Sequence, residues 1–309
     1  MKFLRSLFTF IFIIICLSAF SQSADQPVFL KWKIKPGEVL TYKTVMDEID
    51  TANHKDLDMT GMMKATGMSG FMKSTGSDTS QLAAMNKMMK QVSKELENYS
   101  LVTKLEERRR NIIDIEMSTV ENKQDTTKII VGGTDADDSL KNIGRMLSKL
   151  RMTMGNIVIR GAVYEDGRLE SFYLPNGQRN LVSLFFELPA KAIKPGDTWS
   201  LDTHLISLDQ NFRCDTSYLN KKVTLVAVEI VNGEHIADLE YDIVKYADGD
   251  FKSPFGGESV KTMMKMTYHA LAKFSIGKGR WVLYNGLMSL TSTGFMAQQS
   301  TKKFSLVTQ

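Results

Sequence analysis

Apolar and polar residues alternate along much of the second half of the chain. From Met264 to Ile276 apolar side chains occupy every second position, and Leu271 is the one apolar residue on the polar face. Alternation with a period of two is typical of a strand that buries one face and leaves the other in water. Turn residues between such runs predict three hairpins, which join 157–164 to 168–174, 223–231 to 235–246 and 264–276 to 281–284. A further bend or bulge is expected at Asn285-Gly286.

Helical spacing occurs in three shorter segments. Apolar residues recur every three or four positions in 82–96 and in 140–150. A third helix is expected over 180–188, where Pro189 stops it. The stretch 47–79 is rich in Gly, Ser, Thr, Asp and Met and has no steady period, which predicts a loop or an excursion from the sheet.

A short internal repeat links the two halves of the chain. Ile34–Thr44 recurs as Ile193–Thr203, with five of eleven positions identical. Both copies contain Pro-Gly, which suits a type II turn, and both continue with bulky residues on one face of a departing strand. Two explanations remain open: a duplication that produced two related halves, and two independent uses of a common turn.

These patterns predict a mainly β fold of the α+β class. An antiparallel sheet, or a partly closed half-barrel, would carry two or three peripheral helices. Composition divides the chain into a signal peptide at 1–21, an N-terminal half at 22–155 with the methionine-rich excursion, and a C-terminal antiparallel β half at 156–309.

The first residues have the layout of a secretory signal peptide. Lys2 and Arg5 precede an apolar run, Leu7–Leu17, and small residues follow it. We expect cleavage before Gln22, with a cut after Ala24 as the alternative. The apolar run is much shorter than the roughly 20 residues that span a bilayer as a helix, so no transmembrane segment is expected after processing.

Net charge and cysteine content limit the classes of function that the sequence allows. Loss of Lys2 and Arg5 lowers the net charge from +4 to +2, whereas a nucleic-acid binder would show a clear basic excess. Cys16 follows Ile15, where a lipobox has a small residue, so a lipid anchor is not expected. Cys214 alone survives processing, so the exported chain has no internal disulfide, and a buried free thiol is favoured over a reactive one.

Methionine is the most unusual component of the sequence. Nine of the nineteen methionines fall between Met46 and Met89, with His54 among them. Thioethers are soft ligands that suit Cu(I), but methionine also forms adaptable apolar surfaces. Packing or contact with an apolar ligand is favoured over copper, and the speculative ligand-binding residues are Met59, Met62, Met63, Met68, Met72, Met85 and Met89.

No catalytic motif is present, so we predict that the protein is not an enzyme and uses no cofactor. Two groups of carboxylates could in principle perform acid–base chemistry or bind Ca²⁺. The first group, at 135–138, precedes a predicted helix and is interpreted as a cap, and the second, Asp248 and Asp250, is assigned to a loop. The histidines at 54, 204, 235 and 269 are dispersed, and His269 is expected to be solvated.

The segments Leu188–Trp199 and Phe274–Trp281, together with the end of the signal peptide, resemble a family of exported proteins of unknown function from Bacteroidetes. The resemblance covers most of the mature chain and rests on turn and strand motifs. It implies an exported β-rich protein, and it brings no activity and no site residues.

The leading hypothesis from the sequence is a non-catalytic exported envelope protein that binds or scaffolds an unknown ligand or protein partner. Its expected location is the periplasm or the extracellular space, in association with the outer membrane. The alternative is a periplasmic carrier of a lipid or other apolar ligand, which requires a cavity lined by the inward residues of the long strands. Copper handling through the methionine-rich segment is a lesser alternative.

Overall fold

Eleven strands form one antiparallel sheet in the computed structural model, which describes residues 26–49, 55, 99–121, 157–172, 179–203, 211–252 and 259–309. The strands are β1 (Val39–Glu48), β2 (Tyr99–Arg109), β3 (Ile112–Glu121), β4 (Ile157–Tyr164), β5 (Leu169–Phe172), β6 (Thr198–Ser200), β7 (Phe212–Val231), β8 (Glu234–Phe251), β9 (Val260–Ser275), β10 (Arg280–Ser292) and β11 (Gln298–Thr308). One helix, α6 (Arg179–Phe186), and a single 3-10 turn, η2 (Gly294–Met296), complete the described elements.

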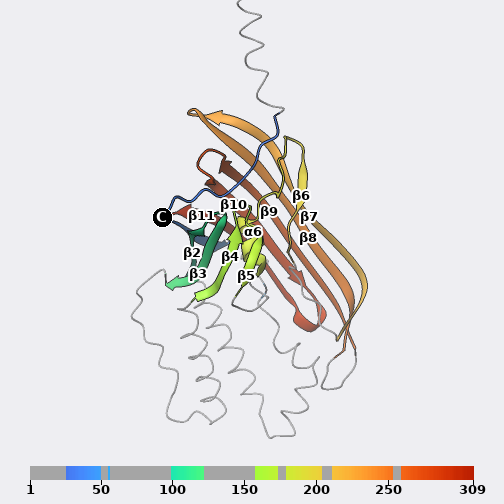
Figure 1. Ribbon diagram of the computed structural model, residues 1–309. Coiled ribbons are helices and arrows are strands. Elements are labelled where there is room, and N and C mark those ends of the chain that lie inside the picture. Colours follow the sequence, from blue (N-terminus) through green and yellow to red (C-terminus); the bar gives the residue numbers. More distant parts are fainter. Residues whose placement is uncertain are drawn as a thin grey trace, which may run out of the picture.

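The sheet consists of two up-and-down meanders, and the first of them starts in its middle. Its strand order is β5-β4-β3-β2-β1-β11-β10-β9-β8-β7-β6, so β1 to β5 form one run and β6 to β11 form the other. The two runs meet where β1 pairs with β11, with Tyr42 opposite Thr308. Strands from both predicted halves of the chain therefore share one sheet (Figure 1). The segment 1–21, predicted as the signal peptide, lies outside the described residues.

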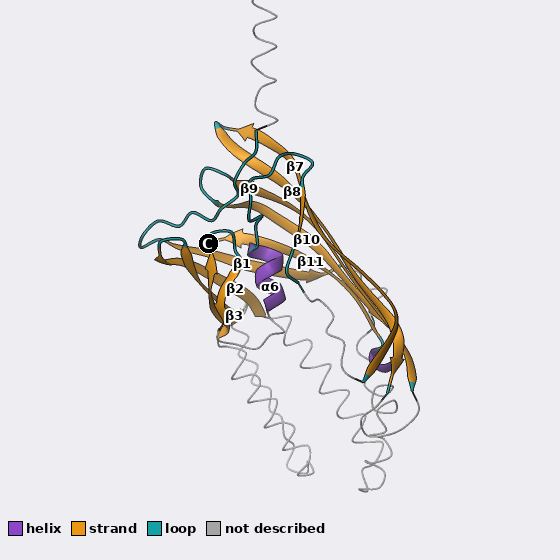
Figure 2. Cartoon of the chain, turned by 45° about the vertical axis from the view of Figure 1, so that its right-hand side comes forward, coloured by secondary structure: helices purple, strands orange, loops and turns teal. Residues whose placement is uncertain are grey.

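The sheet is strongly curved and open, and α6 lies against its concave side (Figure 2). Its edge strands, β5 and β6, are not paired with each other. This arrangement confirms the predicted mainly β, half-barrel architecture. The helix expected over 180–188 is present as α6, whereas those expected over 82–96 and 140–150 fall outside the described residues.

Both copies of the internal repeat form the same turn and begin a meander. Gly37 and Gly196 have φ values of 77° and 92°, as the second central position of a type II turn requires. In each copy the acidic residue after Gly bonds back to the lysine three residues before it. The backbone N–H of Glu38 donates to Lys35 O at 2.8 Å, and that of Asp197 donates to Lys194 O at 2.9 Å. In both copies the carboxylate of the acidic residue accepts the backbone N–H of the lysine at 3.0 Å. The copies lead into β1 and β6, the first strands of the two runs.

The three predicted hairpins are confirmed, but the strands of two of them extend beyond the predicted bounds. The strand expected over 223–231 begins at Phe212, and its partner β8 extends to Phe251. The extension was missed because its sequence is mostly polar, and most of its side chains are exposed on an edge region of the sheet. The bend expected at Asn285-Gly286 is wrong: β10 continues through these residues, and its bulge lies between Trp281 and Leu283 instead.

Candidate functional site

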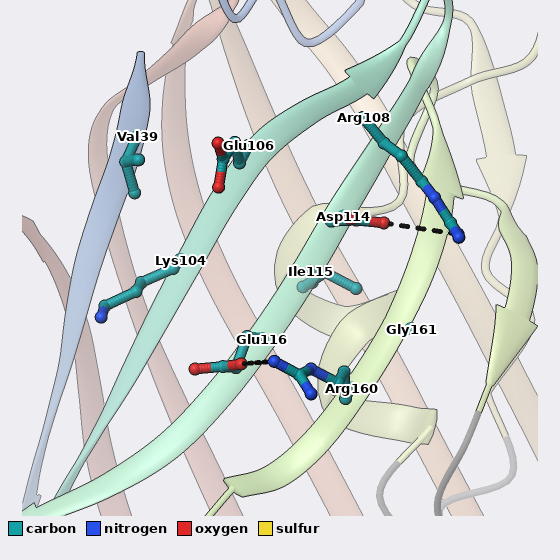
Figure 3. Close-up of a pocket in the computed structure, with 9 residues that line it drawn as sticks. All are labelled: Val39, Lys104, Glu106, Arg108, Asp114, Ile115, Glu116, Arg160 and Gly161. Atoms are coloured by element: carbon teal, nitrogen blue, oxygen red, sulfur yellow. Dashed lines mark ion pairs between the residues drawn. The ribbon is translucent and has the colours of Figure 1, made fainter. Parts of the chain in front are cut away.

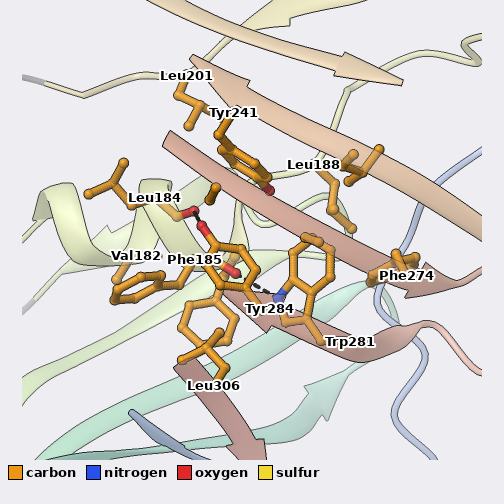
Figure 4. Close-up of a cluster of buried hydrophobic side chains, with 14 of the residues drawn as sticks. Val182, Leu184, Phe185, Leu188, Leu201, Tyr241, Phe274, Trp281, Tyr284 and Leu306 are labelled. Atoms are coloured by element: carbon orange, nitrogen blue, oxygen red, sulfur yellow. Dashed lines mark hydrogen bonds between the residues drawn. The ribbon is translucent and has the colours of Figure 1, made fainter. Parts of the chain in front are cut away.

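The concave face has a tightly packed part around α6, which we call the proximal core. A helix leaves its last carbonyl groups without intrahelical partners. Three side chains satisfy them. Trp281 Nε1 of β10 donates to Phe185 O and Tyr284 Oη of β10 to Leu184 O (Figure 4), and Trp32 Nε1, from the segment before β1, donates to Phe186 O, each at 2.8 Å. These anchoring side chains are at most 3% exposed, so α6 and the aromatic rings fill this part of the concave face.

Buried tyrosines form the boundary of the proximal core. The hydroxyl groups of Tyr268 and Tyr284 lie 2.8 Å apart. Burial raises the pKa of both hydroxyls and that of Tyr241, so all three stay neutral and none can act as a general base near pH 7. The Tyr268 ring lies close to Gly286 on the neighbouring strand, where an added Cβ would come within 2.8 Å of the Tyr268 hydroxyl.

Beyond these tyrosines the long strands continue the concave face as a partly exposed apolar surface. We call it the distal concave surface. Strand alternation and the pairing register place its members on the same face as the buried residues Ile243, Ala247 and Tyr268. It consists of Leu219, Lys245, Met264, Met266, Met288 and Leu290.

Two buried clusters flank this surface, and neither includes the side chains in its middle. Met288 packs against the proximal core, and Met264 packs against a small second cluster near the far ends of β7 and β8. Phe251 and Phe295 stack there, with ring centroids 3.7 Å apart. Met266 and Leu290 belong to neither cluster and remain partly exposed. The surface can therefore offer flexible thioether and aliphatic groups to an apolar ligand.

A pocket of about 470 Å³ opens on the opposite, outer face, over β2, β3 and β4 (Figure 3). Four of its charged residues form two ion pairs: Arg160 with Glu116 at 3.1 Å, and Arg108 with Asp114 at 3.7 Å. These residues are exposed or half-buried, and none of the acids combines with a nucleophile or a histidine in the pocket. We interpret the pocket as a solvated ladder of ion pairs.

The carboxylates assigned to a loop lie instead on the outer face of β8. Asp248 pairs with Lys261 at 2.7 Å, and Asp250 pairs with Arg213. The prediction was wrong because the acids alternate with Ala247, Gly249 and Phe251, and this period of two belongs to a strand. No group of three or more potential metal ligands occurs among the residues that the structure describes.

Cys214 is exposed, so the expectation of a buried thiol is wrong. The chain bulges between Cys214 and Thr216, and the thiol donates to the Thr216 carbonyl at 3.4 Å. His269 is exposed on the outer face beside Asp242, 3.3 Å away, as its place on the polar face of the strand predicts. His204 lies outside the described residues.

All seven methionines predicted as ligand-binding residues, Met59, Met62, Met63, Met68, Met72, Met85 and Met89, also lie outside the described residues. The structure instead brings together a different set, with Met264, Met266 and Met288 on one concave face. The alternating pattern predicts that Met264 and Met266 face the interior. It does not predict that the apolar face extends beyond the packed core.

Comparison of the chain with family models, curated proteins and solved structures gives no match. The search for membrane-spanning helices, restricted to the described part of the chain, finds none of sufficient length and apolar character.

Proposed function

We propose that the protein is a non-catalytic exported envelope protein that binds an apolar ligand or apolar part of a partner through its distal concave surface. The observation that carries this proposal is the contrast along one face of the sheet. The long strands bury Ile243 and Tyr268 completely or almost so, and then leave Met266 and Leu290 partly exposed in the next cross-strand row. Partly exposed, contiguous apolar side chains are typical of a binding surface.

The carrier hypothesis is a second candidate, and the same surface supports it. A carrier must enclose its ligand, and α6 with its aromatic partners leaves no such space in the proximal core. The ligand of a carrier would therefore lie beyond Tyr268, over the distal concave surface. The lesser alternative, copper handling, remains a hypothesis about the methionines at 59–89.

Binding of the neutral apolar fluorophore N-phenyl-1-naphthylamine tests the proposal. We expect its fluorescence to rise with the wild-type protein and to lose most of that rise in the double variant Met266→Gln/Leu290→Gln. The matched control is Leu271→Gln/Leu287→Gln, which makes the same kind of change on the outer face, where Leu271 is 64% exposed. Equal losses in the two variants, or no binding by the wild type, would contradict the proposal.

Export is tested separately by the mass of the protein recovered from the envelope of its own host. We expect a chain that starts at Gln22, or at Asp25 if cleavage follows Ala24. A chain that keeps Met1 and stays in the cytoplasm would overturn this part of the proposal.

A further inference from the structure

The inward faces of the four long strands carry lysines but no carboxylate. From Phe212 to Val223 on β7, and along the inward positions of β8, β9 and β10, the charged side chains are Lys221 and Lys245 alone. The remaining inward side chains are apolar, aromatic or small and uncharged. An ammonium group within an apolar surface is costly unless water or an anion compensates its charge.

Lys245 lies in the middle of the distal concave surface. Its neighbours along β8 on the same face, Ile243 and Ala247, are fully buried. Across the strands it is paired with Leu219 on one side and Met266 on the other. Among the described residues, no acidic group forms an ion pair with Lys245. Lys221, one cross-strand row away, donates only a long bond of 3.4 Å to the Thr203 carbonyl.

Several lysines of the same strands and turns that point outward are paired. Lys261 contacts Asp215 at 2.8 Å and Asp248 at 2.7 Å, and Lys273 contacts Asp238 at 2.8 Å. Lys278, in the turn after β9, contacts Glu234 at 2.8 Å. Within its described strands, the sheet therefore provides counter-charges for these ammonium groups on its outer face and none for Lys221 and Lys245 on its inner face.

We propose that the distal concave surface binds an anionic amphiphile, a molecule with one negatively charged head and an alkyl chain. The head, a carboxylate or a phosphate, contacts the Lys245 ammonium, and Lys221 adds a second cation. The alkyl chain lies across Met266 and Leu290. Leu290 is two strands from Lys245, about 10 Å at the usual strand spacing. This inference rests on the proposed function and names its ligand class.

Three ligands of equal chain length test the role of the charge: hexadecanoate, hexadecyl phosphate and neutral hexadecanol. With wild-type protein we expect calorimetry to give at least about tenfold tighter binding for an anionic ligand than for hexadecanol, as a charge-assisted contact provides. Lys245→Met, which continues the methionine surface, should remove this preference and leave hexadecanol binding unchanged. The preferred anion identifies the head as carboxylate or phosphate.

Lys265→Met is the matched control, because Lys265 is exposed on the outer face of β9. It should keep the wild-type preference. If wild-type protein binds all three ligands equally, the inference fails while the proposed apolar surface stands. If it binds none of them, both fail. The wild-type comparison decides between these outcomes even if Lys245→Met does not fold.

Discussion

The proximal and distal parts of the concave face are built from the same strands but differ in what covers them. Around α6, indole and phenol side chains reach the last carbonyls of the helix, and these side chains are almost completely buried. Beyond Tyr268 the strands continue with Met266 and Leu290, which remain partly exposed. The difference teaches that the same strands can bury one part of their inner face against α6 and leave side chains of the next part partly exposed.

The largest effect should come from a proximal indole. Trp281→Ala removes a ring that contacts Phe274 and Tyr284 and a hydrogen bond to α6, so we expect a loss of about 3–5 kcal/mol in the free energy of unfolding. Leu290→Ala in the distal surface should cost no more than about 1–1.5 kcal/mol, because its side chain is only partly buried. Urea unfolding measures both values, and similar losses would contradict the division into two parts.

The boundary between the two parts is tested at Gly286. An alanine there would place Cβ 2.8 Å from the Tyr268 hydroxyl and 3.1 Å from the Ala270 side chain, so overpacking should destabilise the fold by about 1–3 kcal/mol. Gly277→Ala is the control, since its nearest contact would be 3.9 Å away, and it should change stability by less than about 0.5 kcal/mol. A fully tolerated Gly286→Ala would mean that Tyr268 is free to move and does not form a fixed boundary.

A smaller effect is expected when a single hydroxyl is removed from the proximal core. Tyr284→Phe leaves the Leu184 carbonyl without its partner and should cost about 1–2 kcal/mol in thermal or urea unfolding. Tyr246→Phe removes a hydroxyl that bonds to Asp248 at 3.3 Å on the outer face, and it should have almost no effect. If the two variants behave alike, the phenol–carbonyl bond does not help to hold α6.

Much of this architecture follows from the sequence because local rules determine it. Alternation between Met264 and Ile276 predicts β9, and the two Pro-Gly turns predict the strands that follow them. The role of Gly286 could not be predicted in this way. It depends on the Tyr268 ring of another strand, a long-range contact that local turn rules cannot represent.

The distal surface was only partly predictable for a similar reason. Sequence periodicity assigns Lys245 and Met266 to strands, but exposure depends on where α6 ends its coverage of the sheet. Among the described residues no acid on the inward face pairs with Lys245, and this becomes visible only when the register places Leu219 and Met266 on its two sides. The methionines at 59–89 stood out by composition alone, which gives no information about their neighbours in space.

The smallest predicted effect concerns acid, and it arises at the rim of the sheet, outside both parts of the concave face. The Lys35 N–H and then Arg280 lower the pKa of Glu38 below its ordinary 4.5, and Lys278 and then Ser275 do so for Glu234. A carboxyl group with a lowered folded pKa contributes stability above its unfolded pKa and loses it as pH falls through the folded value. Thermal stability should therefore decline below about pH 4.5.

Glu38→Gln should make this decline shallower, whereas Glu240→Gln, an exposed change on the outer face, should leave it unaltered. Melting temperatures measured between neutral pH and pH 3 provide the check. A steeper decline in Glu38→Gln than in wild type would reverse the sign worked out above.

The meeting of β1 and β11 in the centre of the sheet has a consequence for how the protein assembles. Tyr42 of β1 pairs with Thr308 of β11, near the other end of the chain, and every other strand of the sheet lies between these two strands in sequence. If the chain crosses a secretion channel with its N-terminus first, one edge of β1 stays unpaired until β11 emerges. In that case the two meanders would join late in folding, and a chaperone that shields an open strand edge would act where β1 pairs with β11.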